Sequence, residues 1–231
     1  MSEALLAALP GSLNRSAAEL ASFFIEFPSC LDVSLRVLLK ILSRGHLISL
    51  KGNMSASLGQ LGEIPPPRLR KSLVVGAMNF GIHRRVPIHA RYMTWLVEPR
   101  RRLTADFATL SRGRGPEDAT ALALGRSRVL DNPYVRRLSG LGERVERCDE
   151  AAFQLALRNL ERFHFIGVDA SRDSSVAKLA EIFRFDKTIL TTAVPQSLAA
   201  TAHTLSGTGT PFPEEWVRFD SRLYAAAVSM A

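Results

Sequence analysis

Two short segments of the sequence have residue types and a spacing that favour the binding of a phosphate. Each segment, at residues 28–35 and 97–105, runs from an apolar stretch through a turn into a helical pattern. A helix that starts directly after a strand presents free backbone N–H groups, and its dipole adds to their attraction for an anion. Three consecutive arginines at residues 100–102 lie in the second segment. We expect them either to bind a polyanion or to face solvent or a structural carboxylate.

The elements that must position these segments alternate between strand and helix. Short apolar runs predict strands at residues 23–27, 73–76, 92–97 and 164–168. Amphipathic patterns predict helices at residues 33–42, 99–110, 119–130, 148–163, 174–185 and 215–228. This alternation implies parallel pairing, so we expect an α/β fold, a three-layer sandwich with a central parallel sheet. Residues 52–67 and 191–214 are expected to be flexible loops that border the cleft.

Length and composition favour one folded domain over residues 1–231. The chain has 46% apolar and 23% charged residues, which excludes the collagen-like, coiled-coil and disulfide-framework classes. Cys30 and Cys148 are the only cysteines and lack the paired spacing of a zinc site, which fits a reducing compartment. The first residues lack the basic start of a secretory signal, and no apolar stretch approaches the ~20 residues of a membrane-spanning helix. We therefore expect a soluble, cytoplasmic protein without a membrane partner.

Positive charge is concentrated in the middle of the chain. The formal net charge is +8, and residues 68–147 alone carry a net charge of +10. Such a balance suits a polyanionic partner, for example a nucleic acid, an acidic polysaccharide or the phosphates of a nucleotide. The charge alone does not choose among these partners.

Six sequence blocks follow one another in the order found in a known family. The blocks are FIEFPSCLDVSL at residues 24–35, VVGAMNFGIH at 74–83, YMTWLVEPRRRLTADF at 92–107, DNPYVRRLSG at 131–140, AAFQLALRNLERFHFIG at 151–167 and DSRLY at 220–224. Together they resemble the sulfotransferases that use 3′-phosphoadenosine 5′-phosphosulfate (PAPS), in particular the carbohydrate O-sulfotransferase branch that includes bacterial members and the heparan 2-O type. The resemblance covers residues 23–228 and implies a P-loop-like sulfotransferase fold that takes PAPS as its cofactor.

The resemblance also assigns a cofactor site, but the residues that carry the chemistry are replaced. The implied cofactor-binding positions are Pro28, Ser29, Cys30, Leu31, Asp32, Val33, Ser34 and Leu35 on the 5′ side, with Val97, Arg102 and Ala105 on the 3′-phosphate side. Ser29 stands at the position of the lysine that neutralises the leaving group, and Ala77 at that of the histidine that acts as general base. Val97 and Ala105 stand at the positions of the arginine and the serine that bind the 3′-phosphate.

These replacements predict that sulfuryl transfer has been lost. Direct transfer needs a base near the acceptor hydroxyl and positive charge at the leaving phosphate, and neither is present at its matching position. Asp32 also adds a carboxylate to a loop that should hold a polyanion. We therefore expect a pseudoenzyme that binds a small molecule, an anionic ligand or a partner in the former cofactor cleft. No cofactor is expected, and nucleic acid is not expected as a partner.

Several polar residues are candidates for lining this cleft. They are His83, Glu98, Asp106, Asp131, Asn132 and Arg136. The pair Asp131-Asn132 either lines the acceptor side or caps a helix, and Asp32 is either a helix cap or an acid/base group. The spacing of His83 and His89 fits no usual zinc site, so no metal is expected.

Two other functions remain open at this point. In a repurposed enzyme the old cleft would host a different reaction, with Asp32, Glu98, Asp106 or His83 as the acid/base group. In an active PAPS-dependent O-sulfotransferase the catalytic residues would have been relocated. Titration with a nucleotide separates the active sulfotransferase from the other two functions, and a ligand observed in the cleft would separate a pseudoenzyme from a repurposed enzyme.

Overall fold

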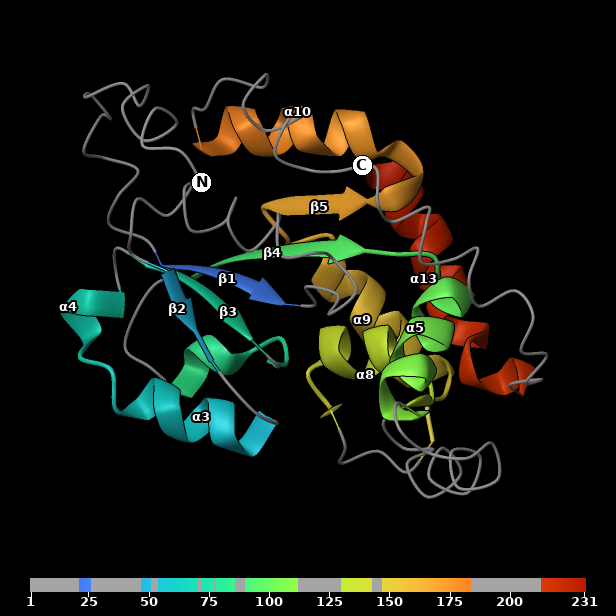
Figure 1. Ribbon diagram of the computed structural model, residues 1–231, viewed down its shortest axis with the longest axis horizontal. Helices are drawn as coiled ribbons and strands as arrows, with labels where there is room; N and C mark the ends of the chain where they lie inside the picture. Colours follow the sequence, from blue (N-terminus) through green and yellow to red (C-terminus); the bar gives the residue numbers. More distant parts are fainter. Residues whose placement is uncertain are drawn as a thin grey trace.

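The chain is built on a parallel β-sheet in the computed structural model (Figure 1). The structure describes residues 21–25, 47–50, 54–69, 72–76, 78–85, 90–111, 130–142, 147–183 and 213–231. In this part of the chain the strands are β1 (Ala21–Ile25), β2 (Leu47–Ser49), β3 (Leu73–Gly76), β4 (Ala90–Leu96) and β5 (Phe165–Val168). Their order is β2-β3-β1-β4-β5, and each neighbouring pair is parallel. The prediction of an α/β fold with a parallel sheet is confirmed.

The predicted strands agree with the observed ones to within two residues at each end. β3 covers the predicted residues 73–76, while β1 and β4 each begin two residues before the predicted start. In β4, every residue from Tyr92 to Leu96 is buried, as expected for a central strand that is covered on both faces. β2 was not predicted, because a strand of three residues is too short to give a recognisable apolar run.

Most of the predicted helices are also present. The helices are α3 (Met54–Gly62), α4 (Pro66–Leu69), α5 (Pro99–Ser111), α8 (Pro133–Ser139), α9 (Glu150–Leu160), α10 (Arg172–Phe183) and α13 (Arg218–Met230), with short 3-10 turns η2 (Ile82–Arg85), η4 (Asp169–Ser171) and η5 (Glu214–Trp216). Asp149 caps α9 as predicted, since its Oδ1 accepts the N–H of Ala152 at 2.8 Å. The helix predicted at 33–42 lies outside the described residues, and so does the helix predicted at 119–130 except for its last residue, Leu130.

The prediction of an irregular loop at residues 52–67 was wrong. This stretch contains α3 and the start of α4. Glycines inside a helix cost about 1 kcal/mol each relative to alanine, which is why Gly59 and Gly62 indicated a loop. Burial of Leu61, which is fully buried on α3, offsets that cost, and Pro66 occupies the first position of α4, where a proline fits. Of the second predicted loop, 191–214, only the last two residues are described, and Glu214 begins η5.

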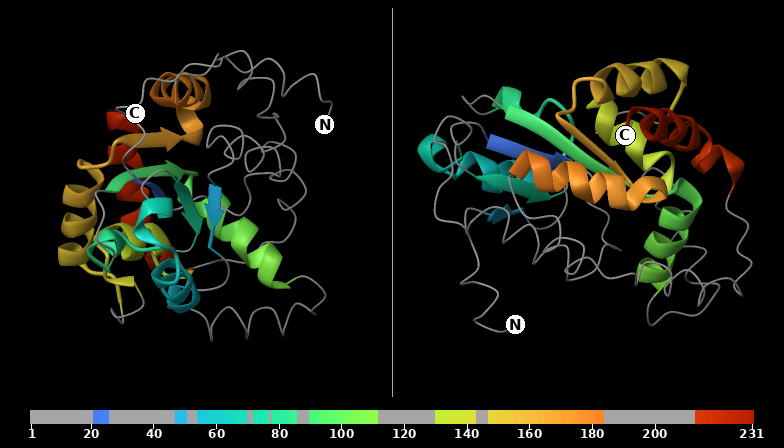
Figure 2. Two further views of the ribbon diagram at one scale, coloured as in Figure 1. Left: turned by 90° about the vertical axis from the view of Figure 1, so that its left-hand side faces the viewer. Right: turned by 90° about the horizontal axis from the view of Figure 1, so that it is seen from above.

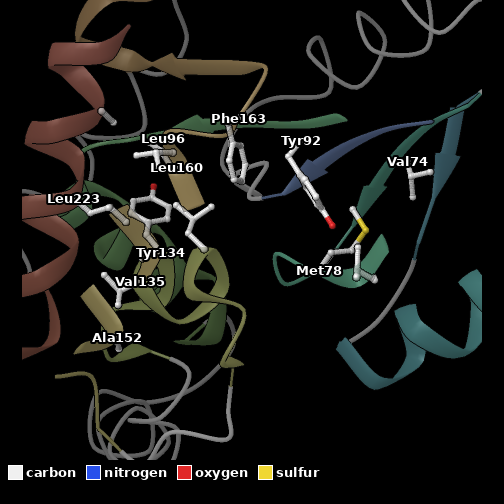
Figure 3. Close-up of a cluster of buried hydrophobic side chains, with 14 of the residues drawn as sticks. Val74, Met78, Tyr92, Leu96, Tyr134, Val135, Ala152, Leu160, Phe163 and Leu223 are labelled. Carbon is white, nitrogen blue, oxygen red and sulfur yellow. The ribbon is translucent and has the colours of Figure 1, made fainter. Parts of the chain in front are cut away.

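The main core lies between the sheet and helices α8, α9 and α13. Leu96 of β4 packs in one cluster with Tyr134 of α8, Leu160 of α9 and Leu223 of α13 (Figure 3). α9 and α10 lie on opposite sides of the sheet (Figure 2). In the described part of the chain, no helix combines the length and the apolar character needed to cross a membrane.

Candidate functional site

The strand order selects one place at the carboxyl edge of the sheet for a ligand. β1 lies between β3 and β4; the chain continues from β1 to β2 on one side and from β4 to β5 on the other. Adjacent strands whose connections diverge in this way leave a crevice outside their carboxyl ends, where ligands of open α/β sheets bind. Residues 26–35, which follow β1, lie outside the described residues, and so does Ala77. The described side of the crevice is residues 97–106, which we call the β4–α5 junction.

The free N–H groups expected at the start of α5 are occupied by a carboxylate of the chain itself. Glu98 Oε1 accepts the N–H of Arg100 at 3.1 Å, and Oε2 accepts the N–H of Arg101 at 2.7 Å. Pro99, the first residue of α5, has no N–H to offer, as predicted for this position. Glu98 therefore stands where an anionic ligand would have to bind the helix start.

Each of the three arginines at residues 100–102 contacts a carboxylate. Arg100 pairs with Glu214 at the surface. The Nη1 atom of Arg101 lies 3.4 Å from Asp169 Oδ2, and the Nε atom of Arg102 lies 3.2 Å from Asp106 Oδ2. With Glu98 included, four carboxylates face three guanidinium groups, so these side chains have a formal charge of −1. Of the alternatives expected for the three arginines, these contacts are those with structural carboxylates.

Tyr134 holds the first residue of the junction. Its hydroxyl accepts the N–H of Val97 at 3.0 Å and donates to the Val97 carbonyl at 2.9 Å. The guanidinium of Arg102 lies over the Tyr134 ring, 4.4 Å from its centroid. Val97 is thus an apolar residue, only 1% exposed, whose backbone is fixed from α8.

Asn132 contacts a helix other than its own. It precedes α8 with a left-handed backbone, φ 45°, and its side chain does not cap α8. Instead, its Oδ1 accepts the N–H groups of Phe219 and Asp220, at 2.8 and 3.0 Å, in the first turn of α13. Its Nδ2 donates to the carbonyl of Glu215 at 2.6 Å. Of the two roles considered for Asn132, these contacts are those of a helix cap.

Asp220 performs the corresponding role for α8. Its Oδ2 accepts the N–H of Tyr134 at 3.0 Å, and its Oδ1 accepts the N–H of Val135 at 2.8 Å. Burial raises the pKa of the Asp220 carboxyl to about 7, although the two backbone hydrogen bonds and the nearby Arg102 oppose this increase. Asp220 is therefore a structural cap whose carboxyl has a raised pKa.

Asp131 and Arg136 form a pair beside this cap. The guanidinium of Arg136 binds the Asp131 carboxylate, and its Nε donates to the Asp131 carbonyl at 2.7 Å. Asp131 Oδ2 also accepts the N–H of Cys148 at 3.4 Å. Burial raises the pKa of the Cys148 thiol to about 12, so this cysteine is a neutral thiol and not a nucleophile near neutral pH.

A second polar contact joins α13 to the carboxyl edge. The Tyr224 hydroxyl donates to Asp169 Oδ1 directly after β5, and it accepts the N–H of Ala170 at 3.3 Å. Burial, together with the hydrogen bond to the Asp169 carboxylate, raises the pKa of Tyr224. Because Arg101 contacts the other oxygen of Asp169, the ends of β4 and β5 are linked through these three side chains.

The structure brings the predicted residues together in two groups. Val97, Glu98, Arg102, Ala105 and Asp106 lie on the β4–α5 junction, and Asp131, Asn132 and Arg136 lie at the start of α8. Tyr134 connects the groups.

His83 lies in η2, and the described contacts join it to neither group. The residues just before it contact other parts of β4 and α8, since the Gly81 N–H donates to the Tyr92 hydroxyl at 3.2 Å and the Phe80 N–H to the carbonyl of Arg137 at 2.9 Å. His83 therefore lies on the side of the last turn of α8. Among the residues that the structure describes, no three His, Cys, Asp or Glu side chains gather as ligands for a metal ion.

Sequence reasoning missed the residues that neutralise and fix the junction. Tyr134 and Asp220 lie in two of the six sequence blocks but had no assigned role, and Asp169 and Glu214 were not singled out. The only local signal was the position of Asp169 directly after a predicted strand. In comparisons with known proteins, neither a family model nor a curated protein matches the chain.

Proposed function

We propose that the chain is a sulfotransferase-fold protein that has lost PAPS-dependent sulfuryl transfer and that binds a ligand or a partner at the former cofactor cleft. Its finer architecture would be the three-layer sandwich of a P-loop-like sulfotransferase. The parallel sheet with β1 at its centre supports this proposal, as do the six sequence blocks. We propose a cytoplasmic location because Cys30 and Cys148 do not form a disulfide framework, which fits a reducing compartment.

One observation carries the functional part of the proposal. The carboxylate of Glu98 accepts the N–H groups of Arg100 and Arg101 at the start of α5. The side chains of all three neighbouring arginines contact carboxylates. A 3′-phosphate carries negative charge and needs oriented donors, so it would have to displace Glu98 and compete with these ion pairs. Val97 and Ala105 offer no side-chain donor in compensation. This charge pattern favours a ligand with less negative charge than PAPS.

The chemistry of sulfuryl transfer leads to the same conclusion. A general base must remove the proton of the acceptor hydroxyl, and positive charge must stabilise the leaving phosphate. Ser29 and Ala77 supply neither group, by residue type. Glu98, a candidate base for a repurposed enzyme, is engaged as the cap of α5.

A direct assay tests the loss of activity. The full chain would be incubated with PAPS and a mixture of polysaccharide acceptors, and release of the desulfated nucleotide would be followed by chromatography. We expect no release above that of a heat-denatured sample. Release that depends on both folded protein and acceptor would show an active sulfotransferase with relocated residues.

A further inference from the structure

Val97 belongs to none of the residue pairs in the described ladders of the sheet. It follows the last paired residues of both neighbouring ladders, Phe24 with Met93 between β1 and β4 and Leu96 with Val168 between β4 and β5. It is nevertheless 1% exposed. Buried backbone groups are nearly always bonded, and the Tyr134 hydroxyl is positioned to bond both the N–H and the carbonyl of Val97. One side-chain oxygen therefore fixes the backbone at the point where the chain leaves β4 for α5.

Tyr134 is itself held from the C-terminal helix. It is the second residue of α8, and its N–H donates to Asp220 Oδ2 on α13 at 3.0 Å. Its ring is fully buried near Leu160 and Leu223 (Figure 3). The guanidinium of Arg102 covers one face of the ring. The backbone end of Tyr134 is thus tied to α13, and its hydroxyl end is tied to the β4–α5 junction.

We propose that Tyr134 is the positioning residue of the β4–α5 junction, and that Asp220 acts on this junction through Tyr134. A shift of the Asp220 carboxylate moves the start of α8 and with it the phenol that holds Val97. Val97 precedes Glu98, so the N-terminal cap of α5 follows the same movement. This inference rests on the proposed function only in that it treats the junction as the ligand-binding edge.

Amide hydrogen exchange of the full chain, followed by NMR, tests the positioning role. In Y134F the ring stays but the hydroxyl is lost. We expect the protection of the Val97 amide to fall about fivefold to tenfold, measured relative to the amide of Ala156 in α9. This is the loss expected for one net hydrogen bond. Y92F is the matched control, because the Tyr92 hydroxyl accepts the N–H of Gly81 instead. We expect Y92F to leave the ratio of Val97 to Ala156 unchanged. An unchanged ratio in Y134F, or an equal fall in Y92F, overturns the positioning role.

A double-mutant cycle tests the action of Asp220 through Tyr134. D220N should also lower the relative protection of Val97, while D149N, which alters the cap of α9, should not. In the double variant D220N/Y134F, the protection of Val97 should fall no further than in Y134F alone. Additive losses at Val97 would show that Asp220 does not act through Tyr134.

These measurements use no ligand, so they fail independently of the proposed function. If the chain proved to be an active sulfotransferase while Val97 responded as expected, the positioning role would stand and the proposed function would fall. If the protection of Val97 did not change in Y134F and the chain bound no nucleotide, the proposed function would stand and the positioning role would fall.

Discussion

Asn132 and Asp220 cap each other's helices. Asn132 Oδ1 accepts two N–H groups in the first turn of α13, one of them from Asp220 itself at 3.0 Å, and the Asp220 carboxylate accepts two N–H groups in the first turn of α8. Both side chains are 1% exposed. Helix starts leave N–H groups without intrahelical partners, and here two helices supply each other's missing acceptors. The start of α8 and the start of α13 therefore depend on each other.

Loss of the Asn132 side chain should destabilise the fold more than loss of an ordinary cap. Glycine tolerates the left-handed backbone at position 132, so N132G reports the lost hydrogen bonds without added strain. Since one buried and one partly buried N–H group lose their acceptor, we expect a decrease of about 2–4 kcal/mol in the free energy of unfolding by urea. The control D149A removes an exposed cap from α9 and should cost about 1 kcal/mol. A cost in N132G no larger than that in D149A would contradict the reciprocal cap.

Asp220 should make stability depend on pH in a direction opposite to that of most carboxylates. Its pKa is raised from 3.8 to about 7 in the folded chain, so the folded state holds this proton more tightly than the unfolded state does. The free energy of unfolding should therefore fall as pH rises between these two values, and this contribution should level off above the folded pKa. D220N lacks the titrating group. The difference in stability between the two proteins, measured by urea unfolding from pH 4 to pH 8, should show this slope, and a flat difference would show that the carboxyl titrates normally.

Removal of the Glu98 carboxylate should open the start of α5 to anions. E98A loses the acceptor of the Arg100 and Arg101 N–H groups, so we expect a loss of stability of about 1 kcal/mol. It also frees these donors beside three arginines, so added sulfate should raise the melting temperature of E98A more than that of the wild type. E150A is the matched control, because Glu150 is an exposed carboxylate that pairs with Arg222 on another surface. Equal responses of E98A and E150A to sulfate would show that Glu98 does not block an anion site.

The fold was predictable wherever a local pattern decides the structure. Pro99 at the start of α5 and Asp149 as the cap of α9 follow from the few residues around them, and alternation of strands and helices gave the parallel sheet. α3 was not predictable in this way, because its glycines oppose a helix locally and the burial of Leu61 that outweighs them is a tertiary effect. Local propensity is a weak guide where packing overrides it.

The change from strand to helix at the β4–α5 junction was predictable, but the distant partners of its side chains were not. The junction at residues 97–105 follows from a strand that leads into a helix. Two of the four carboxylates, Glu98 and Asp106, are neighbours of the arginines in sequence. The other two come from distant parts of the chain: Asp169 lies 68 residues beyond Arg101, and Glu214 lies 114 residues beyond Arg100. Tyr134, which holds Val97, lies 37 residues beyond it. The Asn132 contact with Asp220 spans 88 residues. No spacing rule within one element indicates such distant pairs, so the sequence could only offer contact with a structural carboxylate as one alternative for the three arginines and could not name Asp169 or Glu214 as the partners.

Calorimetric titration with 3′-phosphoadenosine 5′-phosphate, the desulfated nucleotide, tests most directly the proposal that the chain does not bind PAPS. Titrations at low salt and at about 0.15 M salt separate diffuse attraction to the basic middle of the chain from binding by oriented donors, because salt screens the first far more than the second. We predict weak heat at low salt that disappears at the higher salt concentration, since Ser29, Val97 and Ala105 offer no charged donor and Glu98 occupies the start of α5. A micromolar dissociation constant that persists at the higher salt concentration would contradict the pseudoenzyme and favour an active sulfotransferase.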